Sequence, residues 1–327
     1  MLSSFLTLVS VLVVEFSVTP CSGFVLLRRP SARPSSRAGL KMQLQSVQPL
    51  EREIQRVEED EANAAAGRKV KHVLTLIRHG HSVWNQDNIF TGWVDVPLAK
   101  DGEAEAREAG QIMKAADIKP DKVYVSVLKR AIQTTWIALE EMDRMWLPVE
   151  CNWRLNERHY GGLSGLNKIE TVQKHGEEQV HIWRRSYDIP PPPVDKHSQY
   201  WPGHDERYKL VPEDELPLSE SLKLTKDRFM VAWQGNIVPD LMAGKRLLVS
   251  AHGNSLRALV MHLDDISKEV IPSLNIPTGV PLVYYLDKQL KPLRHPDAIE
   301  PLSGQYLGDQ EKIKARIGAV KAQTGAK

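Results

Sequence analysis

The chain has 327 residues, of which 42% are hydrophobic and 26% are charged. This length and composition suit an ordinary globular enzyme and exclude disordered and fibrous proteins. The formal net charge of +2 arises in residues 1–50, which carry five basic residues and one acid, so residues 51–327 hold 38 basic and 40 acidic residues. Because this larger part is nearly neutral, we do not expect nucleic acid as a partner.

Residues 1–42 are predicted to be a bipartite leader that directs the chain to a plastid of secondary endosymbiotic origin. The apolar stretch "FLTLVSVLVVEF" is short for a membrane span and is typical of a signal peptide. The next stretch, "FVLLRRPSARPSSRAGLKMQ", is rich in Arg and Ser and lacks acids, as transit peptides do. A mitochondrial or secretory leader and an uncleaved signal anchor are the alternatives. We expect no stable membrane insertion of the mature form.

Residues 43–70 are predicted to be a charged linker, because "EREIQRVEEDEANAAAGRK" consists largely of charged residues and Ala. Cysteine usage indicates an intracellular location for the part that follows. Cys21 lies in the leader, so Cys151 alone remains in a mature form and no intrachain disulfide is possible there.

Three short apolar segments rich in β-branched residues are predicted to be strands buried on both faces: residues 72–77, 122–127 and 246–251. Helical sequence separates each from the next. This order predicts an α/β fold, a three-layer sandwich in which helices flank a mostly parallel central sheet. Ligands of such sheets bind beyond the carboxyl ends of the strands, where the motifs "RHGHS", "SVLKRA" and "SAHGNS" fall.

Two of the intervening segments have the periodicity of helices with one buried stripe. Residues 98–116 begin after a Pro and carry acids early. Their expected buried side consists of Ala106, Ala109, Ile112 and Met113. In residues 128–142 the expected buried stripe consists of Ile132, Trp136 and Leu139. Residues 152–215 are long, rich in Pro, Trp and Tyr, and without sustained periodicity, so we expect a lid over the site.

Five side chains at the ends of these elements could form a phosphoryl-transfer site: Arg78, His79, Arg130, Glu157 and His252. Arg offers a planar set of donors that matches phosphate oxygens, and neutral imidazole is a good nucleophile toward phosphorus near neutral pH. A second imidazole can stabilise the transferring oxygens, and a carboxylic acid can protonate the leaving oxygen. The sequence has no Walker loop, CxxC pair or HExxH motif, so we expect no metal.

Longer motifs carry a resemblance to a known family. In order and at compatible spacing, from about Val73 to Ile313, the chain contains "LIRHGHSVWNQDNIFTGWVDVPL", "SVLKRAIQT", "LNERHYGGLSGLNK", "WRRSYD", "AHGNSLRAL" and "NIPTGVPLVY". These stretches resemble the cofactor-dependent phosphoglycerate mutases of the histidine phosphatase superfamily. The resemblance implies a catalytic domain over residues 71–313 that interconverts 3-phosphoglycerate and 2-phosphoglycerate in glycolysis and gluconeogenesis. It also implies 2,3-bisphosphoglycerate as primer and a possible homodimer or homotetramer.

Carried over by motif, the resemblance makes His79 the residue that is phosphorylated, with Arg78 and Arg130 gripping the phosphoryl group and His252 completing that pocket. Glu157 becomes the proton donor and acceptor. The further substrate contacts that it implies are Asn85, Thr91, Gly92, Arg158, Tyr160, Lys168, Arg184, Arg185 and Asn254. Without the surrounding match, the basic residues of "WRR" and Lys168 would be interpreted as a solvated basic face.

The chain departs from the family pattern at three places. His81 stands where the family commonly has Glu, and could be a second phosphate acceptor, a pH-sensitive modulator or a tolerated turn residue. The loop near residues 295–305 is longer than expected. Residues 314–327 form a basic, Ala- and Gly-rich tail that we expect to be mobile.

Two rival functions remain at this point. A bisphosphoglycerate synthase or a histidine-type phosphatase would use the same His79, although the many basic contacts oppose a simple phosphatase. A non-catalytic scaffold that keeps the fold would have no need of a nucleophile.

Overall fold

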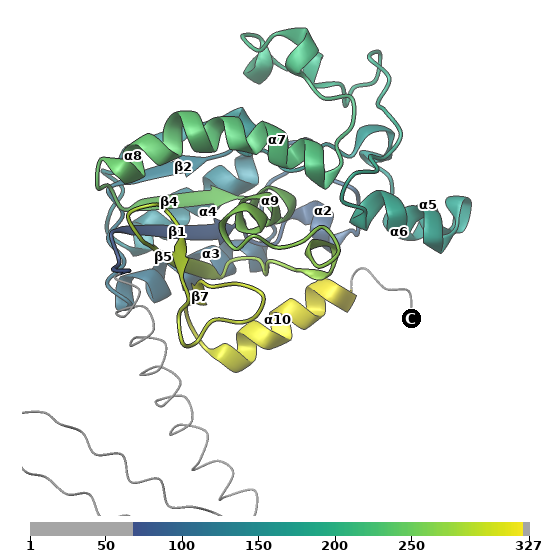
Figure 1. Cartoon of the computed structure of the whole chain (residues 1–327). Coiled ribbons are helices and arrows are strands. Elements are labelled where there is room, and N and C mark those ends of the chain that lie inside the picture. Colours follow the sequence, from purple (N-terminus) through teal and green to yellow (C-terminus); the bar gives the residue numbers. More distant parts are fainter. Residues whose placement is uncertain (1–67, 323–327) are drawn as a thin grey trace, which may run out of the picture. The chain divides into compact units, whose positions relative to one another are not determined.

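The computed structural model describes residues 68–322, so the expected leader and nearly all of the expected linker lie outside the described residues. The core of this part is a seven-stranded sheet in the order β3-β2-β4-β1-β5-β6, with β7 also paired to β5 (Figure 1). The strands are β1 (His72–Arg78), β2 (Lys122–Val125), β3 (Val149–Cys151), β4 (Leu247–Ala251), β5 (Pro281–Leu286), β6 (Pro292–Leu293) and β7 (Gln305–Tyr306). No helix among these residues is long and apolar enough to cross a bilayer.

Strands β1 to β4 pair in parallel, whereas β5 runs antiparallel to β1 and to its two other neighbours. The expected α/β architecture with helices flanking a central sheet is therefore confirmed, and the sheet is mixed. The three strands expected from apolar runs are β1, β2 and β4. All five residues of β4 are buried, as a strand covered on both faces requires.

The helices are α2 (Val83–Gln86), α3 (Lys100–Ala115), α4 (Lys129–Glu141), α5 (Lys168–His175), α6 (Glu177–Arg185), α7 (Leu222–Ala232), α8 (Val238–Met242), α9 (Gly253–Leu263) and α10 (Gln310–Ala322). Strand β1 sends alternate side chains to opposite layers. Leu76 packs with Phe229 of α7 and Leu256 of α9, whereas Ile77 packs with Met113 of α3 and Ala138 of α4. The sheet is thus enclosed between α3 and α4 on one face and α7 and α9 on the other (Figure 1).

The expected buried side of α3 is confirmed for Ala106, Ala109 and Met113, but that of α4 is wrong at Trp136, which is 59% exposed. Helix α4 instead buries small residues, among them Ala131, Thr134 and Ala138. Small residues are needed because α3 and α4 approach closely: a Cβ on Gly110 of α3 would lie 2.6 Å from the Ala138 carbonyl oxygen. Leu139 is buried in the same layer, as expected, whereas Trp136 faces away from this contact.

Residues 152–215, expected to be an irregular lid, contain the two helices α5 and α6 and several single 3₁₀ turns. Their later part has a small core of its own, in which Val194, Trp201, Tyr208 and Leu216 pack around Trp93. The expected boundary between residues 313 and 314 lies within α10, where Ile313 is buried. Residues 314–322 therefore continue a helix.

Candidate active site

The register of the sheet brings together the two histidines expected from sequence. Arg78 of β1 is paired with Ala251 of β4, so His79 and His252 each follow directly at the same edge. Their ring centroids are 5.0 Å apart. Both side chains are buried, and Nε2 of His252 lies 2.7 Å from the hydroxyl of Ser126, which follows β2. Three parallel strands thus end at one site, as expected for the carboxyl edge of such a sheet.

A backbone contact fixes the tautomer of His79. Its Nδ1 lies 2.7 Å from the carbonyl oxygen of Gly80, which can only accept, so Nδ1 carries the proton and Nε2 presents a lone pair. Burial, together with the guanidinium of Arg130, holds the pKa of His79 well below its usual range. The imidazole is therefore neutral at pH 7, the state that a nucleophile needs.

Two guanidiniums, that of buried Arg130 and that of half-buried Arg78, lie beside His79 and are held by backbone carbonyls. Arg78 donates to the Ile276 carbonyl at 2.7 Å, and Arg130 donates to those of Gly92 at 2.8 Å and Val94 at 3.0 Å. Among residues 68–322, no carboxylate is hydrogen-bonded to either side chain. Burial lowers the pKa of Arg130 to about 10. Two cations that are held by neutral groups in this way suit the binding of an anion.

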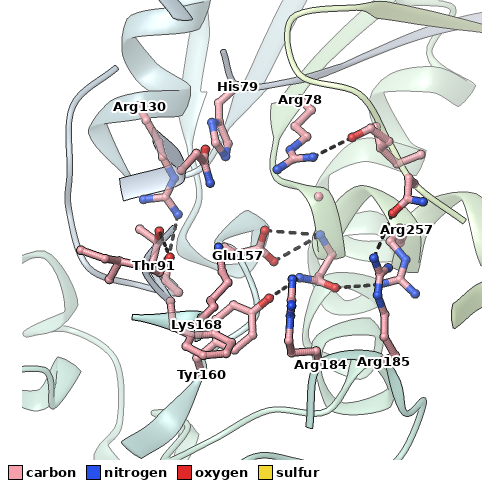
Figure 2. A pocket seen from close by; sticks show the side chains of 18 residues that line it. Arg78, His79, Thr91, Arg130, Glu157, Tyr160, Lys168, Arg184, Arg185 and Arg257 are labelled. Atoms are coloured by element: carbon pink, nitrogen blue, oxygen red, sulfur yellow. Dashed lines mark hydrogen bonds between the residues drawn. The ribbon is translucent and has the colours of Figure 1, made fainter. Parts of the chain in front are cut away.

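The carboxylate of Glu157 faces this group of cations (Figure 2). It accepts hydrogen bonds from the backbone N–H of Arg158 at 2.7 Å and of Asn254, at the start of α9, at 3.2 Å. Among the described residues that line the cavity, Glu157 is the only one with a carboxylate. A single acid among many cations is suited to move a proton at the substrate oxygen.

A second group of cations lies across the cavity from His79 (Figure 2). Helices α5 and α6 contribute Lys168, Arg184 and Arg185, and α9 contributes Arg257. Arg185 donates to Asn275 Oδ1 at 3.2 Å. With Arg78 and Arg130, six cationic side chains line one cavity.

Tyr160 and Lys168 have shifted pKa values in this environment. Burial raises the pKa of Tyr160, but the nearby guanidiniums of Arg158 and Arg184 together outweigh this effect, so that the pKa is lowered to about 8. Burial, with the neighbouring charge of Arg184, also lowers the pKa of Lys168 to about 8. Both groups therefore change charge just above neutral pH.

All the site residues expected from sequence line this cavity except His252 and Arg158. His252 is buried next to His79 but does not line the cavity. Arg158 is buried beneath the site, where it donates to the Arg184 carbonyl at 2.8 Å and its guanidinium carbon lies 4.7 Å from the centre of the Tyr160 ring. Its contribution is to hold Tyr160 and α6 in place, because it does not reach the cavity.

Several residues that line the cavity were not identified from the sequence. Two of them, Arg257 and Asn275, have polar side chains that form hydrogen bonds with other lining residues. Arg257 donates to Asn254 Oδ1 at 2.9 Å and to the Ile271 carbonyl at 2.6 Å. Burial lowers its pKa to about 9. Arg257 lies one turn after Asn254, so the helical spacing from the "HGN" motif was the signal that could have identified it.

The structure places His81 outside the cavity. Its Nδ1 lies 2.8 Å from Asp101 Oδ2 in the first turn of α3, and its backbone N–H donates to Glu105 at 2.8 Å. This position favours the interpretation of His81 as a turn residue over that of a second phosphate acceptor. Across the described residues, no group of three or more His, Cys, Asp or Glu is placed to hold a metal ion.

Residues 74–289 match the family model of the histidine phosphatase superfamily (branch 1), which is more than half of the chain. The chain therefore belongs to this superfamily of enzymes, which transfer phosphoryl groups through a histidine. The buried, neutral His79 between Arg78 and Arg130 is the residue of this site with the required chemistry.

Solved structures show the same fold at low sequence identity. A protein described as mycobacterial hydrolase 1 has a TM-score of 0.53 at 19% identity, over 68% of this chain and 95% of its own. The α-ribazole phosphatase of Shigella flexneri has a TM-score of 0.51 at 20% identity, over 73% and 99%. A mycobacterial glucosyl-3-phosphoglycerate phosphatase has a TM-score of 0.50 at 21% identity, over 65% and 92%.

Proposed function

We propose that this protein interconverts 3-phosphoglycerate and 2-phosphoglycerate and is primed by 2,3-bisphosphoglycerate. The observation that carries the proposal is the distribution of charge in the cavity: six cationic side chains in two groups face a single carboxylate. The group beside His79 suits the phosphoryl group that is transferred. The group across the cavity suits the remaining anionic groups of a substrate that is held between two transfers.

Each transfer can be written from these residues. Nε2 of His79 attacks phosphorus, so that an N–P bond forms while the P–O bond to the substrate breaks. Arg78 and Arg130 stabilise the charge on the transferring oxygens, and Glu157 donates its proton to the leaving oxygen. In the reverse step Glu157 takes the proton from the attacking hydroxyl.

In the full cycle His79 first receives a phosphoryl group from the primer. His79 gives this group to the free hydroxyl of 3-phosphoglycerate, which forms 2,3-bisphosphoglycerate. After this intermediate reorients in the site, His79 takes its other phosphoryl group and 2-phosphoglycerate is released.

The residues present fit the primer, which carries two phosphoryl groups and a carboxylate. Within residues 68–322, Nε of Arg78 and Nε of Arg257 are buried without a hydrogen-bond partner. Buried donors of this kind are normally satisfied, so an anion in the cavity is a natural partner for such cations. Arg184, Arg185 and Lys168 would hold the end of the primer that lies away from His79.

A phosphatase is the second candidate. It is supported by the phosphatases among the proteins of similar fold, and it needs only His79, its two arginines and an acid. A bisphosphoglycerate synthase would use the same cavity. The two functions differ from a mutase in what leaves the site: a phosphatase releases inorganic phosphate, whereas a mutase retains the bisphosphate.

The test incubates the full chain with 3-phosphoglycerate, with and without added 2,3-bisphosphoglycerate, and measures 2-phosphoglycerate and inorganic phosphate in the same reaction. We expect 2-phosphoglycerate to form and the primer to stimulate its formation. Release of inorganic phosphate should be slower than formation of 2-phosphoglycerate by a factor of about ten or more. Phosphate release without 2-phosphoglycerate would replace the proposal by the phosphatase. His79→Ala should abolish turnover and the acid-labile phosphoryl label that the wild-type protein takes from labelled primer.

A further inference from the structure

The segment that carries Glu157 is buried although it belongs to no helix or strand. Residues 156–160 have no regular hydrogen-bond pattern, yet Asn156, Arg158 and His159 are at most 1% exposed. Buried backbone groups need partners, and here no strand or helix supplies them. The position of the proposed acid must therefore be fixed by side chains from elsewhere.

Arg228 of α7 binds two carbonyls of this segment and two of the 3₁₀ turn just before it. Its Nη1 donates to the carbonyl oxygens of Arg154 at 2.7 Å and Trp153 at 3.4 Å. Its Nη2 donates to those of Asn156 and Glu157, both at 3.2 Å. One planar guanidinium thus binds four carbonyls in the stretch that ends at Glu157.

Glu220, just before α7, fixes Arg228 in turn. Nε and Nη2 of Arg228 donate to the two carboxylate oxygens of Glu220 at 2.7 and 2.8 Å. The Glu220 carboxylate also accepts the backbone N–H of His159 at 2.8 Å, and the Glu220 backbone N–H donates to the His159 carbonyl at 2.9 Å. The two side chains of this pair are only 6% and 3% exposed.

Glu157 is therefore held from two directions. Its backbone is bound by Arg228 and by Nε1 of Trp93, which donates to its carbonyl at 2.6 Å, while its carboxylate is bound by the start of α9. Helices α7 and α9 pack against each other. Neither Arg228 nor Glu220 lines the cavity.

We propose that Arg228, oriented by Glu220, is a positioning residue that sets where the Glu157 carboxylate meets the substrate oxygen. This inference rests on the proposed role of Glu157 in proton transfer. A displacement of about 1 Å at a reacting group can cost about 100-fold in rate. The planar fork of Arg makes six hydrogen bonds here, whereas the ammonium of Lys has three donors and cannot bind both Glu220 oxygens and four carbonyls.

The test compares two substrates in the Arg228→Lys variant. With phosphoglycerate the leaving oxygen needs a proton, whereas p-nitrophenyl phosphate releases a stable anion and does not depend on Glu157. We expect kcat to fall about 10- to 100-fold for phosphoglycerate and to stay within about threefold for p-nitrophenyl phosphate. Equal losses with both substrates would overturn the inference and leave Arg228 with a structural role.

A double variant supplies an independent readout. If Arg228 acts through Glu157, adding Arg228→Lys to the Glu157→Gln variant should lower kcat for phosphoglycerate by less than a further factor of about three. If the two residues act independently, the losses in kcat of the two single variants should multiply. Arg154→Lys is the matched control, because this Arg lies in the same segment but pairs with Glu215 at the surface, and its activity with both substrates should be unchanged. Multiplying effects would contradict the proposal.

Glu220→Gln covers the case in which Arg228→Lys does not fold, as judged by circular dichroism. Gln keeps an oxygen for the His159 N–H but weakens the contact to Arg228, so it should show the same selective loss with phosphoglycerate. An unselective loss or no loss would again overturn the inference. If the wild-type protein turns over neither substrate, the proposed function has failed, which is a distinct result.

Discussion

At the scale of single residues, six cationic side chains line the cavity, and Glu157 is the only carboxylate among the described residues that do so. His79 is kept neutral first because it is buried, and also because protonation would place a further cation beside Arg130 and Arg78. Across the cavity, burial and the neighbouring charge of Arg184 lower the pKa of Lys168 to about 8, and the pKa of Tyr160 is also lowered to about 8. The cavity therefore has its greatest affinity for anions at or below neutral pH.

Alkaline pH should weaken substrate binding. Above about pH 8 Lys168 loses its positive charge and Tyr160 becomes an anion, so kcat/KM for phosphoglycerate should fall, while kcat at saturation changes less because bound anion keeps Lys168 protonated. The measurement is kcat/KM from pH 6.5 to 9.5. Tyr160→Phe should make the fall shallower, since one of the two ionisations is gone. A profile that stays flat to pH 9.5 would rule out this account.

His81→Glu should leave the chemistry largely intact. The variant loses the hydrogen bond to Asp101 and places a carboxylate beside it, so we expect stability to fall by about 1 kcal/mol. Activity should stay within about tenfold of wild type, because His81 does not line the cavity. Urea unfolding and the mutase assay provide the two measurements, and His81→Gln, which can still donate to Asp101, is the control. A phosphoenzyme that no longer forms would place His81 in the chemistry after all.

At the scale of elements, the turn after β1 is held against the start of α3 by close backbone contact. A Cβ on Gly102 would lie 1.9 Å from the His81 carbonyl oxygen, and one on Gly80 would lie 2.2 Å from the Gly102 carbonyl oxygen. Thr134 of α4 also accepts the Gly80 N–H at 3.0 Å. Helices α3 and α4 thus fix the turn that presents His79.

Gly102→Ala should damage both stability and catalysis. The added methyl group must push α3 away from the turn, and overpacking of this kind costs typically about 1–3 kcal/mol. We expect a lower urea midpoint and a fall in kcat, since His79 moves with the turn. The matched control is Gly235→Ala, because a Cβ there meets nothing within 4 Å. Equal behaviour of the two variants would show that the turn tolerates the displacement.

At the scale of the whole molecule, several histidines are buried in the neutral form. Burial is the first cause that lowers the pKa of His79 and His252 far below the usual range, and it lowers the pKa of His159 to about 4. In the unfolded chain these groups bind protons below about pH 6.5, whereas in the folded chain they do not until the pH is much lower. Acid therefore favours unfolding.

Because of these histidines, the free energy of unfolding should fall below about pH 6.5, by up to about 1.4 kcal/mol per pH unit for each buried histidine. Urea unfolding at pH 7.5 and pH 5.5 measures this difference. In the His159→Asn variant, Asn can still accept the Gly161 N–H. The difference in unfolding free energy between the two pH values should therefore be smaller than in the wild type by the contribution of one buried histidine. An unchanged difference in the variant would mean that His159 does not contribute.

Much of this protein follows from its sequence. Strands β1, β2 and β4 could be predicted because strands covered on both faces are continuous apolar runs. The site residues at their ends could be predicted because parallel strands bring their carboxyl ends to one edge. The motif resemblance supplied Lys168, Arg184 and Arg185 of the second group of cations. These features depend on local composition and on a rule of topology, both of which a single chain displays.

Other features were decided by tertiary packing. Trp136 is exposed because α4 meets α3 through small residues, and periodicity along one helix does not say which stripe its neighbour can accept. Arg158 lies beneath the cavity while Arg257 enters it, although both occur in the matched motifs. Arg228 and Glu220 gain their role only when α7 lies against a segment about 70 residues earlier in the chain. Contacts of this kind depend on which surfaces meet, and the sequence of one element does not determine its partner.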